Sequence, residues 1–322
     1  MTKIRTAIIG AAGYTGGELV RLLLQHPQCE LVHIHSNSQK GKRLDEVHPD
    51  LLGESDLVFS DEVPVDGIDA VFLGLPHGEA RPFLEQHPFS AETVVIDLST
   101  DFRDESHGFV YGLPEINKGR IRQAKRISNP GCFATTVQLA ALPAVAHGLV
   151  NQTLHVTGIT GSTGAGKKLS ETTQFSQRNQ NVSVYKLFNH QHLKEINQTF
   201  KQLNPDFDQH ILFAPYRGNF SRGIWITAYF PYEGSLDEAY DLYRAFYSDA
   251  PFTLVSDKDI DLKQVVNTNK CILHLKKEAG QLVVYSISDN LLKGASGQAV
   301  QNFNLAFGLD EKEGLSLKSI AF

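Results

Sequence analysis

The N-terminal stretch of the chain constrains its fold most strongly. Residues 4–9 form a short apolar strand pattern, and residues 18–25 form an amphipathic helix pattern that Pro27 ends. The glycine-rich run GAAGYTG lies between them, at residues 10–16. A strand, a glycine-rich turn and a helix N-terminus in this order form a phosphate cradle, because glycines allow close approach and the helix end attracts an anion. The spacing is GxxGxxG rather than GxGxxG, so a tight strand-to-helix turn without a ligand is the alternative.

This order predicts a Rossmann-type dinucleotide-binding domain. Folds of this type that select NAD usually end their second strand with Asp or Glu, which binds the ribose 2′-hydroxyl. Here the strand pattern over residues 30–35 leads into SNSQKGKR at residues 36–43, which has hydroxyls and cations but no carboxylate. We therefore expect NADP(H), although the same lysines also fit a solvated loop. The expected cofactor contacts are Gly10, Gly13, Tyr14, Thr15, Gly16, Ser36, Lys40, Pro76, Gly164 and Asn290.

Two further strand patterns end in turns that can hold a ligand. Residues 70–75 lead into Pro76, and residues 94–98 lead into STDFR at residues 99–103. Ligands of a doubly wound sheet gather at the carboxyl ends of its strands. Arg103 is therefore placed to clamp a carboxylate or a phosphate with two parallel hydrogen bonds. A surface salt bridge explains Arg103 equally well.

The stretch SNPGCFATT, residues 128–136, carries the candidate nucleophile. Pro130 and Gly131 break a preceding strand, and an apolar run from Phe133 to about Val145 predicts a helix that has Cys132 in its first turn. Unpaired backbone N–H groups and the helix dipole favour thiolate over thiol there, below the usual pKa of about 8.5. The alternative is that Cys132 is a small buried hydrophobic residue, as most free cysteines are.

From about residue 151 the pattern changes to a second, α+β domain. Alternating strand patterns cover residues 153–160, 224–230, 271–276 and 282–287, with helices expected at 193–203 and 236–246. These predict a mostly antiparallel sheet. The segment from Asp289 leads into an amphipathic helix that ends near Phe307, which we expect to return to the first domain and complete the cofactor cleft. The predicted domains are 1–148 with 290–322, and 149–289.

The loop GSTGAGKK, residues 161–168, nearly matches a phosphate-binding loop of nucleoside triphosphatases. Its last position is Lys168, where such a loop has the Ser or Thr that holds Mg²⁺. The interpretation that fits better is a loop whose backbone amides meet another phosphate or an oxyanion.

Two histidines lie close together at His190 and His192, and Glu195 follows. The segment lacks a further ligand at supportive spacing, so no metal site is expected. An imidazole titrates near neutrality and suits the acid–base partner of a thiolate, although a lone histidine is usually structural.

The composition is that of an ordinary globular protein. Hydrophobic residues make up 41% and charged residues 20% of the 322 residues, and the net charge is −6, which argues against general binding to nucleic acid or membrane surfaces. The three cysteines are far apart and suit a reducing cytosol. The start MTKI shows no signal peptide and no apolar run is long enough to span a membrane, so we expect a cytoplasmic protein.

One kind of reaction would use the dinucleotide fold, the cysteine and the histidine together, namely hydride transfer to a carbon at the oxidation level of a carboxylic acid. A thiolate attacks an acyl phosphate, phosphate leaves, and hydride from NADPH reduces the thioester. The resulting hemithioacetal collapses to an aldehyde while a histidine handles the proton. Arg103 and the loop at residues 161–166 are the candidate donors to the phosphate and the oxyanion.

Several ordered motifs resemble those of N-acetyl-gamma-glutamyl-phosphate reductases, oxidoreductases of arginine biosynthesis, over nearly the whole chain. The matching stretches are residues 10–16, 97–103, 111–115, 129–135, 161–166, 190–192 and 289–302. The resemblance implies Cys132 as the nucleophile and His190 as the acid–base group. It also implies an NADP-linked fold, a second domain of the semialdehyde-dehydrogenase type, and homodimers or homotetramers formed through its sheet. The residues expected around the small-molecule substrate are Arg103, Asn129, Ser162, His192 and Glu195.

Two departures from the family pattern concern the substrate. The family usually has Thr-Pro-Glu after its second histidine, whereas this chain has Leu193 and Lys194 before Glu195. The family also usually has Pro-His where Pro215 is followed by Tyr216. We hypothesise that both changes lie near the acyl end of the substrate, which would then carry a larger or charged group such as succinyl instead of acetyl.

Two rival functions remain at this point. Aspartate-semialdehyde dehydrogenases share the fold and mechanism, but their cysteine directly follows an asparagine, whereas Pro130 and Gly131 intervene here. The rival from another class is a non-catalytic NADP-binding regulator, in which Cys132 would be unreactive.

Overall fold

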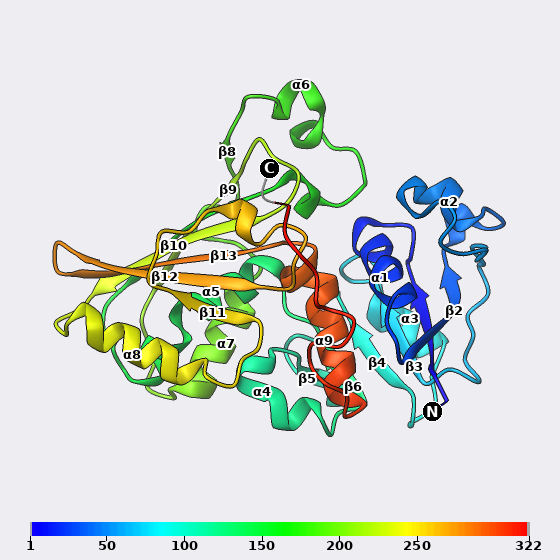
Figure 1. The fold of residues 1–322 in the computed structure, drawn as a ribbon, viewed down its shortest axis with the longest axis horizontal. Coiled ribbons are helices and arrows are strands. Elements are labelled where there is room, and N and C mark those ends of the chain that lie inside the picture. Colours follow the sequence, from blue (N-terminus) through cyan, green and yellow to red (C-terminus); the bar gives the residue numbers. More distant parts are fainter. Residues whose placement is uncertain (1, 321–322) are drawn as a thin grey trace. The chain divides into compact units, whose positions relative to one another are not determined.

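The computed structural model describes residues 2–320, which divide into two compact units (Figure 1). The first unit contains residues 2–131 and 295–316, and the second contains residues 132–294 and 317–320. The boundary lies at residue 131 instead of the expected 148, because the helix that begins at Cys132 packs on the second unit's sheet. The other predicted boundary, at residue 290, falls near the observed change at residue 295.

A six-stranded parallel sheet forms the centre of the first unit, in the order β2-β1-β3-β4-β6-β5. Its strands are β1 (Ile4–Ile9), β2 (Cys29–His35), β3 (Ala70–Leu73), β4 (Val94–Asp97), β5 (Val110–Tyr111) and β6 (Arg126–Ser128). The strands β3 and β4 are buried at every position, as expected where both faces of a parallel sheet are covered. The doubly wound fold class is confirmed.

Helices accompany this sheet, and the last of them comes from the far end of the chain. The helices are α1 (Tyr14–Leu24), α2 (Leu44–Val47), α3 (Ala80–Gln86), α4 (Pro114–Ile121) and α9 (Gly297–Ala306). Helix α9 contacts α1, α4 and β4. The prediction that the C-terminal helix returns to the first domain is therefore confirmed.

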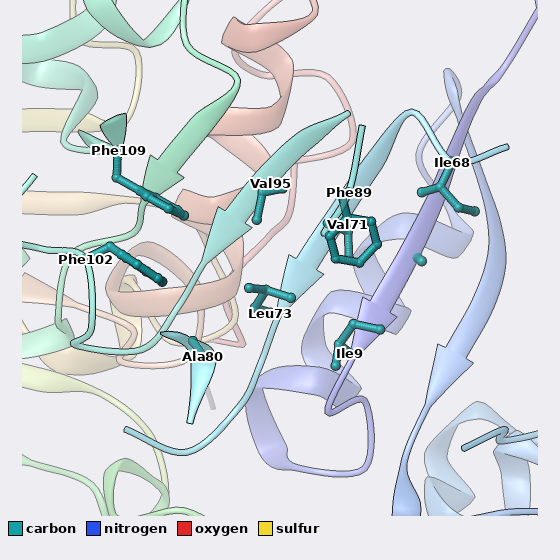
Figure 2. Packing of buried hydrophobic residues seen from close by; sticks show 10 residues of the cluster. Ile9, Ile68, Val71, Leu73, Ala80, Phe89, Val95, Phe102 and Phe109 are labelled. Atoms are coloured by element: carbon teal, nitrogen blue, oxygen red, sulfur yellow. The ribbon is translucent and has the colours of Figure 1, made fainter. Parts of the chain in front are cut away.

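A hydrophobic cluster packs against the first sheet (Figure 2). Ile9, Leu73 and Val95 come from three neighbouring strands, and all three side chains are fully buried. The rings of Phe102 and Phe109 stack beside them, with centroids 4.1 Å apart and an interplanar angle of 6°. This packing holds the segment that carries Arg103, the residue after Phe102, against the sheet.

The second unit is built on a seven-stranded mixed sheet in the order β11-β12-β13-β10-β7-β9-β8. Four of its six neighbouring pairs are antiparallel, which confirms the predicted α+β architecture. The strands are β7 (Leu154–Thr160), β8 (Ser183–Val184), β9 (Ile211–Arg217), β10 (Ile224–Pro231), β11 (Thr253–Ser256), β12 (Cys271–Glu278) and β13 (Gln281–Ser288).

Helix α5 (Cys132–Ala146) is the central helix of this unit. It is apolar on all sides and buried from Phe133 to Val145, because it contacts β10, β13 and two other helices. Those helices are α7 (Leu193–Leu203) and α8 (Leu236–Phe246). Hydroxyls of Tyr243 on α8 and of Tyr247, the residue after it, donate to carbonyls of α5, at 2.7 Å and 2.6 Å. A short helix, α6 (Phe175–Arg178), precedes β8.

Within residues 2–320, we find no helix whose length and apolar character would let it cross a membrane.

Candidate active site

Cys132 is the first residue of helix α5, where the sequence predicted it. The helix dipole places partial positive charge at this end, beside the sulfur. Cys132 is half-buried, whereas Cys29 and Cys271 are buried. Burial raises the pKa of the Cys29 thiol to about 11. Of the three thiols, only that of Cys132 is both partly accessible to solvent and located at the N-terminus of a helix.

Gly294 lies against Cys132. A Cβ atom at Gly294 would approach the Cys132 Cβ to 2.8 Å and its Cα to 3.2 Å, closer than ordinary packing allows. The glycine belongs to a π-helical turn, Leu292–Ser296, and its N–H donates to the Asp289 carbonyl at 2.9 Å. The absence of a side chain at residue 294 keeps space beside the Cys132 side chain.

His190 is buried in an aromatic setting next to the start of α5. Its ring lies 5.8 Å from Phe133, the residue after Cys132, and 5.5 Å from Phe213 of β9. Tyr185 approaches it edge-on, at 5.7 Å. The structure therefore brings the two predicted catalytic residues, Cys132 and His190, into one region of the second unit.

His192 and Glu195 complete this region. His192 immediately precedes α7, and its ring lies 4.6 Å from that of His190. Its Nε2 is 3.9 Å from Oε1 of Glu195, and both side chains are buried. Among residues 2–320, no three His, Cys, Asp or Glu side chains are grouped so as to hold a metal ion.

The charge state of His190 follows from its surroundings. Burial, and secondarily the charge of Lys186, lowers the pKa of His190 from 6.5 to about 4. The ring is therefore neutral near pH 7. Tyr185 shares this environment, because burial and the charge of Cys132 both raise its pKa.

The loop at residues 161–166 differs from its prediction. Its N–H groups were expected to meet a phosphate or an oxyanion, but those of Ser162 and Thr163 donate to the carbonyls of Phe220 and Ser221, at 2.8 Å and 3.1 Å. The amides of Gly164 and Gly166 donate within the loop itself. These four groups are already bonded, so this expectation is wrong for them. The side chain of Ser162 stays a candidate substrate contact.

Asn290 ties the same loop in place. Its Oδ1 accepts from the amide of Gly223 at 2.7 Å, and its Nδ2 donates to Thr163 Oγ1 at 3.0 Å. Asn290 is buried. A Cβ atom placed on Gly164 would lie 4.0 Å from the side-chain amide nitrogen of Asn290. Both residues, which we expected at the cofactor, thus also stabilise the loop.

In the first unit, Arg103 is buried and fixed at the carboxyl ends of β4 and β6. Its Nε donates to the Asn129 carbonyl at 3.0 Å, and its Nη2 donates to the Leu98 carbonyl at 3.1 Å. The side chain of Asn129 donates to the Ala295 carbonyl at 3.0 Å and accepts from Asn302 at 3.1 Å. Both predicted substrate residues are therefore held rigidly.

The glycine-rich turn has the properties of an anion site. Gly10 adopts a φ of +81°, and a Cβ there would lie 2.6 Å from the Gly74 carbonyl oxygen, so only glycine fits. Helix α1 begins at Tyr14, and the N–H groups of Tyr14, Thr15 and Gly16 have no acceptor among residues 2–320. Such donors at a helix N-terminus suit the phosphates of a dinucleotide. The residues present therefore fit a nicotinamide cofactor.

The predicted 2′-phosphate contacts lie after β2. Ser36 is buried, with its Oγ 3.4 Å from that of Ser38. Lys40 is exposed and forms an ion pair with Asp61 at 2.8 Å, a partner that the sequence did not suggest. Pro76 is exposed in the turn after β3.

Comparison with known proteins adds to this geometry. The family described as "Semialdehyde dehydrogenase, NAD binding domain" matches residues 5–124, and "Semialdehyde dehydrogenase, dimerisation domain" matches residues 132–290. An N-acetyl-gamma-glutamyl-phosphate reductase of Parabacteroides distasonis is 54% identical, covering 99% of this chain and all of its own. One from Christiangramia forsetii is 53% identical over 98% of this chain and 99% of its own. The chain belongs to the N-acetyl-gamma-glutamyl-phosphate reductase family.

Solved structures of other semialdehyde dehydrogenases share this fold at low identity. Aspartate semialdehyde dehydrogenase II of Vibrio cholerae superposes with a TM-score of 0.76 at 16% identity, over 96% of this chain and 99% of its own. The Candida albicans aspartate semialdehyde dehydrogenase with NADP gives 0.72 at 14%, over 94% and 98%. Because these likenesses show the fold alone, the family membership rests on the reductases, and the two rival functions are disfavoured.

Two residues of this region were missed from the sequence. Tyr185 follows the short strand β8, and the Arg217 guanidinium carbon lies 4.9 Å from the centre of its ring. Tyr185 ends the run VSVY at residues 182–185, which is too short to predict an element and carries no motif, so no strong local signal marks it. Arg217 directly follows Tyr216, which was singled out as a departure from the family pattern, and its charge was the available signal.

Proposed function

We propose that this chain catalyses the NADPH-dependent reduction of N-acetyl-gamma-glutamyl phosphate to N-acetylglutamate semialdehyde and phosphate, a step of arginine biosynthesis. The relatives named for this reductase, matched over nearly the full length, support the substrate. The observation that carries the chemistry is the half-buried Cys132 at the start of α5, beside the buried His190 that packs on Phe133.

Cys132 is the proposed nucleophile. Its sulfur attacks the γ-carbonyl carbon of the acyl phosphate, and the carbon–oxygen bond to phosphate breaks to leave a thioester. A bound NADPH supplies the hydride that reduces this thioester. The carbon–sulfur bond of the hemithioacetal then breaks to release the aldehyde and regenerate the thiolate.

His190 is the proposed acid–base group. Its neutral ring can donate a hydrogen bond to the oxygen that becomes negative during both carbonyl steps. We assign His192 and Glu195, which lie beside it, to substrate binding together with Ser162. Arg103 and Asn129 are the proposed substrate contacts of the first unit, where the buried guanidinium suits the phosphate.

The decisive experiment runs the reaction in reverse, as NADP⁺ reduction with phosphate and N-acetylglutamate semialdehyde. We expect Cys132→Ser to lower kcat/KM by about 10³-fold or more, and the control Cys271→Ala to keep most of the activity. Aspartate semialdehyde should be a poor substrate. Full activity of Cys132→Ser would overturn the mechanism, and a strong preference for an N-succinyl substrate would revive the hypothesis of a larger acyl group.

We infer further that the cofactor is NADP(H) rather than NAD(H). Ser36 and Lys40 follow β2, where a 2′-phosphate would lie, and the ion pair of Lys40 with Asp61 holds the lysine near the strand. Lys40→Ala should raise KM for NADPH several-fold and leave KM for NADH unchanged. The exposed Lys42 supplies the control, because Lys42→Ala should affect neither cofactor. Equal affinity of the wild type for both cofactors would contradict this inference.

We also infer a homodimer or homotetramer formed through the second sheet. Along β10, Ile224, Ile226 and Ala228 are buried, whereas the alternate residues Trp225 and Tyr229 are partly exposed. An apolar face of this kind, in the segment that matches a dimerisation domain, suits a second copy of the chain. Light scattering should give at least twice the chain mass, and Tyr229→Glu should shift it toward the monomer.

A cytosolic location is the remaining part of the proposal. None of the three cysteines, all of which the structure describes, forms a disulfide, which suits a reducing compartment. Fractionation of cells that produce the protein should recover it with cytosolic markers.

A further inference from the structure

Arg217 is a cation that the proposed chemistry has not used. It ends strand β9 and pairs in register with Ser183 of β8. The next turn brings Tyr185 back to the same strand, where its N–H donates to the Pro215 carbonyl at 3.1 Å. The backbone therefore fixes Arg217 and Tyr185 side by side.

A row of edge-to-face ring contacts leads from Arg217 toward Cys132. The Arg217 guanidinium carbon lies 4.9 Å from the Tyr185 ring centre, and this ring lies 5.7 Å from that of His190. His190 packs at 5.8 Å on Phe133, which follows Cys132 in helix α5. Both Cys132 and Arg217 affect the pKa of Tyr185, since the charge of Cys132 raises it and that of Arg217 lowers it. Arg217 thus lies in the region of Cys132, at the far side of Tyr185.

The Arg217 guanidinium is only partly hydrogen-bonded within the described residues. Its Nη1 donates to Thr172 Oγ1 at 3.1 Å, whereas its buried Nε has no hydrogen-bond partner among residues 2–320. No carboxylate in the same range of residues lies within ion-pair distance of Arg217. Arg222, by contrast, is paired with the buried Asp289 at 3.1 Å and is structural.

A half-buried arginine that stacks on an aromatic ring and lacks an acid partner suits a carboxylate ligand. The planar guanidinium can give two parallel hydrogen bonds to a carboxylate, and the ring beneath it limits its motion. Partial burial strengthens the attraction because less water competes. The substrate of the proposed function carries its α-carboxylate at the end remote from the reacting γ-carbonyl.

We propose that Arg217, held over the Tyr185 ring, binds a carboxylate of the substrate and thereby determines which N-acyl-glutamyl compounds the site accepts. This inference rests on the proposed function. The carboxylate has two possible sources: the α-carboxylate of the glutamyl group, or a carboxylate at the end of a larger N-acyl group such as succinyl.

The variant Arg217→Met keeps an unbranched apolar stem and removes the guanidinium with its charge. Arg244→Met is the matched control, because Arg244 also lies 4.9 Å from a tyrosine ring centre, that of Tyr240, but on the exposed side of α8. We expect Arg217→Met to raise KM for the preferred semialdehyde about 10- to 100-fold with little change in kcat, the loss typical of a charged hydrogen bond. Arg217→Lys should recover part of this loss, and Arg244→Met should change neither constant.

Three substrates identify the carboxylate: N-acetylglutamate semialdehyde, its α-carboxamide, and the N-succinyl compound. If Arg217 binds the α-carboxylate, the wild type turns over the α-carboxamide poorly, and Arg217→Met loses nothing more with it. If Arg217 binds the acyl end, the wild type prefers the N-succinyl compound and Arg217→Met abolishes that preference. A KM within twofold of the wild type for all three substrates would overturn the proposal.

Failure of the proposed function gives a different result. In that case the wild type turns over none of the three semialdehydes, and binding is measured by the rate at which iodoacetamide alkylates Cys132. Glutarate, an unreactive dicarboxylate, should slow alkylation in the wild type and Arg244→Met but not in Arg217→Met. Equal protection of all three proteins, or protection of none, would reject Arg217 as the carboxylate site. Thermal unfolding of each variant verifies that it is folded.

Discussion

The backbone N–H of His192 donates a hydrogen bond to Nδ1 of His190 across 3.3 Å. A backbone N–H can only donate, so Nδ1 carries a lone pair and the single proton of the neutral ring is on Nε2. Burial keeps the ring neutral, with a pKa of about 4. His190 is therefore prepared to donate from Nε2 to an oxygen that gains negative charge, before it has to accept any proton.

The burial of His190 predicts how stability depends on pH. The pKa of His190 is about 4 in the folded chain and 6.5 as its ordinary value, so between these pH values the unfolded chain binds a proton that the folded chain does not. The free energy of unfolding should thus fall as pH falls from 6.5 to 4, and this contribution should level off below pH 4. In His190→Asn the fall should be smaller. Urea unfolding at pH 4.5 and 7.5 measures the difference.

The control for this measurement is His210→Asn, because His210 is exposed. Its pH dependence should match that of the wild type. A residual slope is expected in every variant, since burial also lowers the pKa of three histidines in the first unit, namely His26, His33 and His35. Parallel pH profiles for His190→Asn and the wild type would show that His190 is not the group whose lowered pKa causes the loss of stability.

The three cysteines should differ strongly in reactivity. In the native chain at pH 7.5, iodoacetamide should alkylate Cys132 first, because Cys29 and Cys271 are buried and the pKa of Cys29 is raised to about 11. Peptide mass spectrometry at successive times gives each rate separately. In urea the three rates should converge, which provides the internal control. Faster alkylation of Cys271 than of Cys132 in the native chain would contradict the assigned nucleophile.

Elements that carry their own signals could be predicted from the sequence. Helices α7 and α8 have the expected bounds because both are amphipathic and Ser235 caps α8, accepting from the Glu238 amide at 3.2 Å. Strand β9 was missed because Pro215 interrupts its pattern, and this residue is tolerated there since its carbonyl still accepts from Tyr185. Local pattern was sufficient only where an element's own residues determine its structure.

The remaining differences arise from contacts that are distant in sequence. Periodicity identified the helix after Cys132, but an evenly apolar helix does not reveal which sheet it will cover, so its domain was misassigned. The amides of Ser162 and Thr163 were expected to be available for a ligand, because their acceptors lie about sixty residues later, in a loop with no special pattern. The unpaired Nε of Arg217 is likewise a property of the folded chain alone.

The contact between Gly294 and Cys132 predicts a severe effect of a single methyl group. Gly294→Ala places a Cβ 2.8 Å from the Cys132 Cβ, so the start of α5 or the π-helical turn must move. Overpacking of this kind costs about 1–3 kcal/mol, and we expect kcat to fall at least tenfold as the sulfur shifts. Steady-state kinetics and urea unfolding together measure both effects.

Gly119→Ala is the matched control for that variant. Gly119 lies in the exposed part of α4, and a Cβ there would meet nothing within 4 Å. Alanine should raise the free energy of unfolding by roughly 0.5–1 kcal/mol, because it is the better helix former, and should leave kcat unchanged. If Gly294→Ala behaved like Gly119→Ala, the space beside Cys132 would have no role in catalysis.

Asp101, two residues before Arg103, should matter for stability rather than for catalysis. Its carboxylate accepts from the backbone N–H groups of Gly78, Ala80 and Arg81, at 2.7, 3.0 and 3.1 Å, and so caps the start of α3. Asp101→Ala leaves three donors without their acceptor and should lower the free energy of unfolding by about 1–3 kcal/mol.

The nearby Asp104→Ala separates this capping from a general effect of charge. Asp104 also accepts two hydrogen bonds, but both come from Ser106 in an exposed turn, so its loss should cost less than about 1 kcal/mol. Urea unfolding of the two variants should show the larger loss for Asp101→Ala, with KM for phosphate in the reverse reaction unchanged in both. A large rise of that KM in Asp101→Ala would mean that the cap positions Arg103 as well as α3, and the two aspartates would then differ in catalysis and not only in stability.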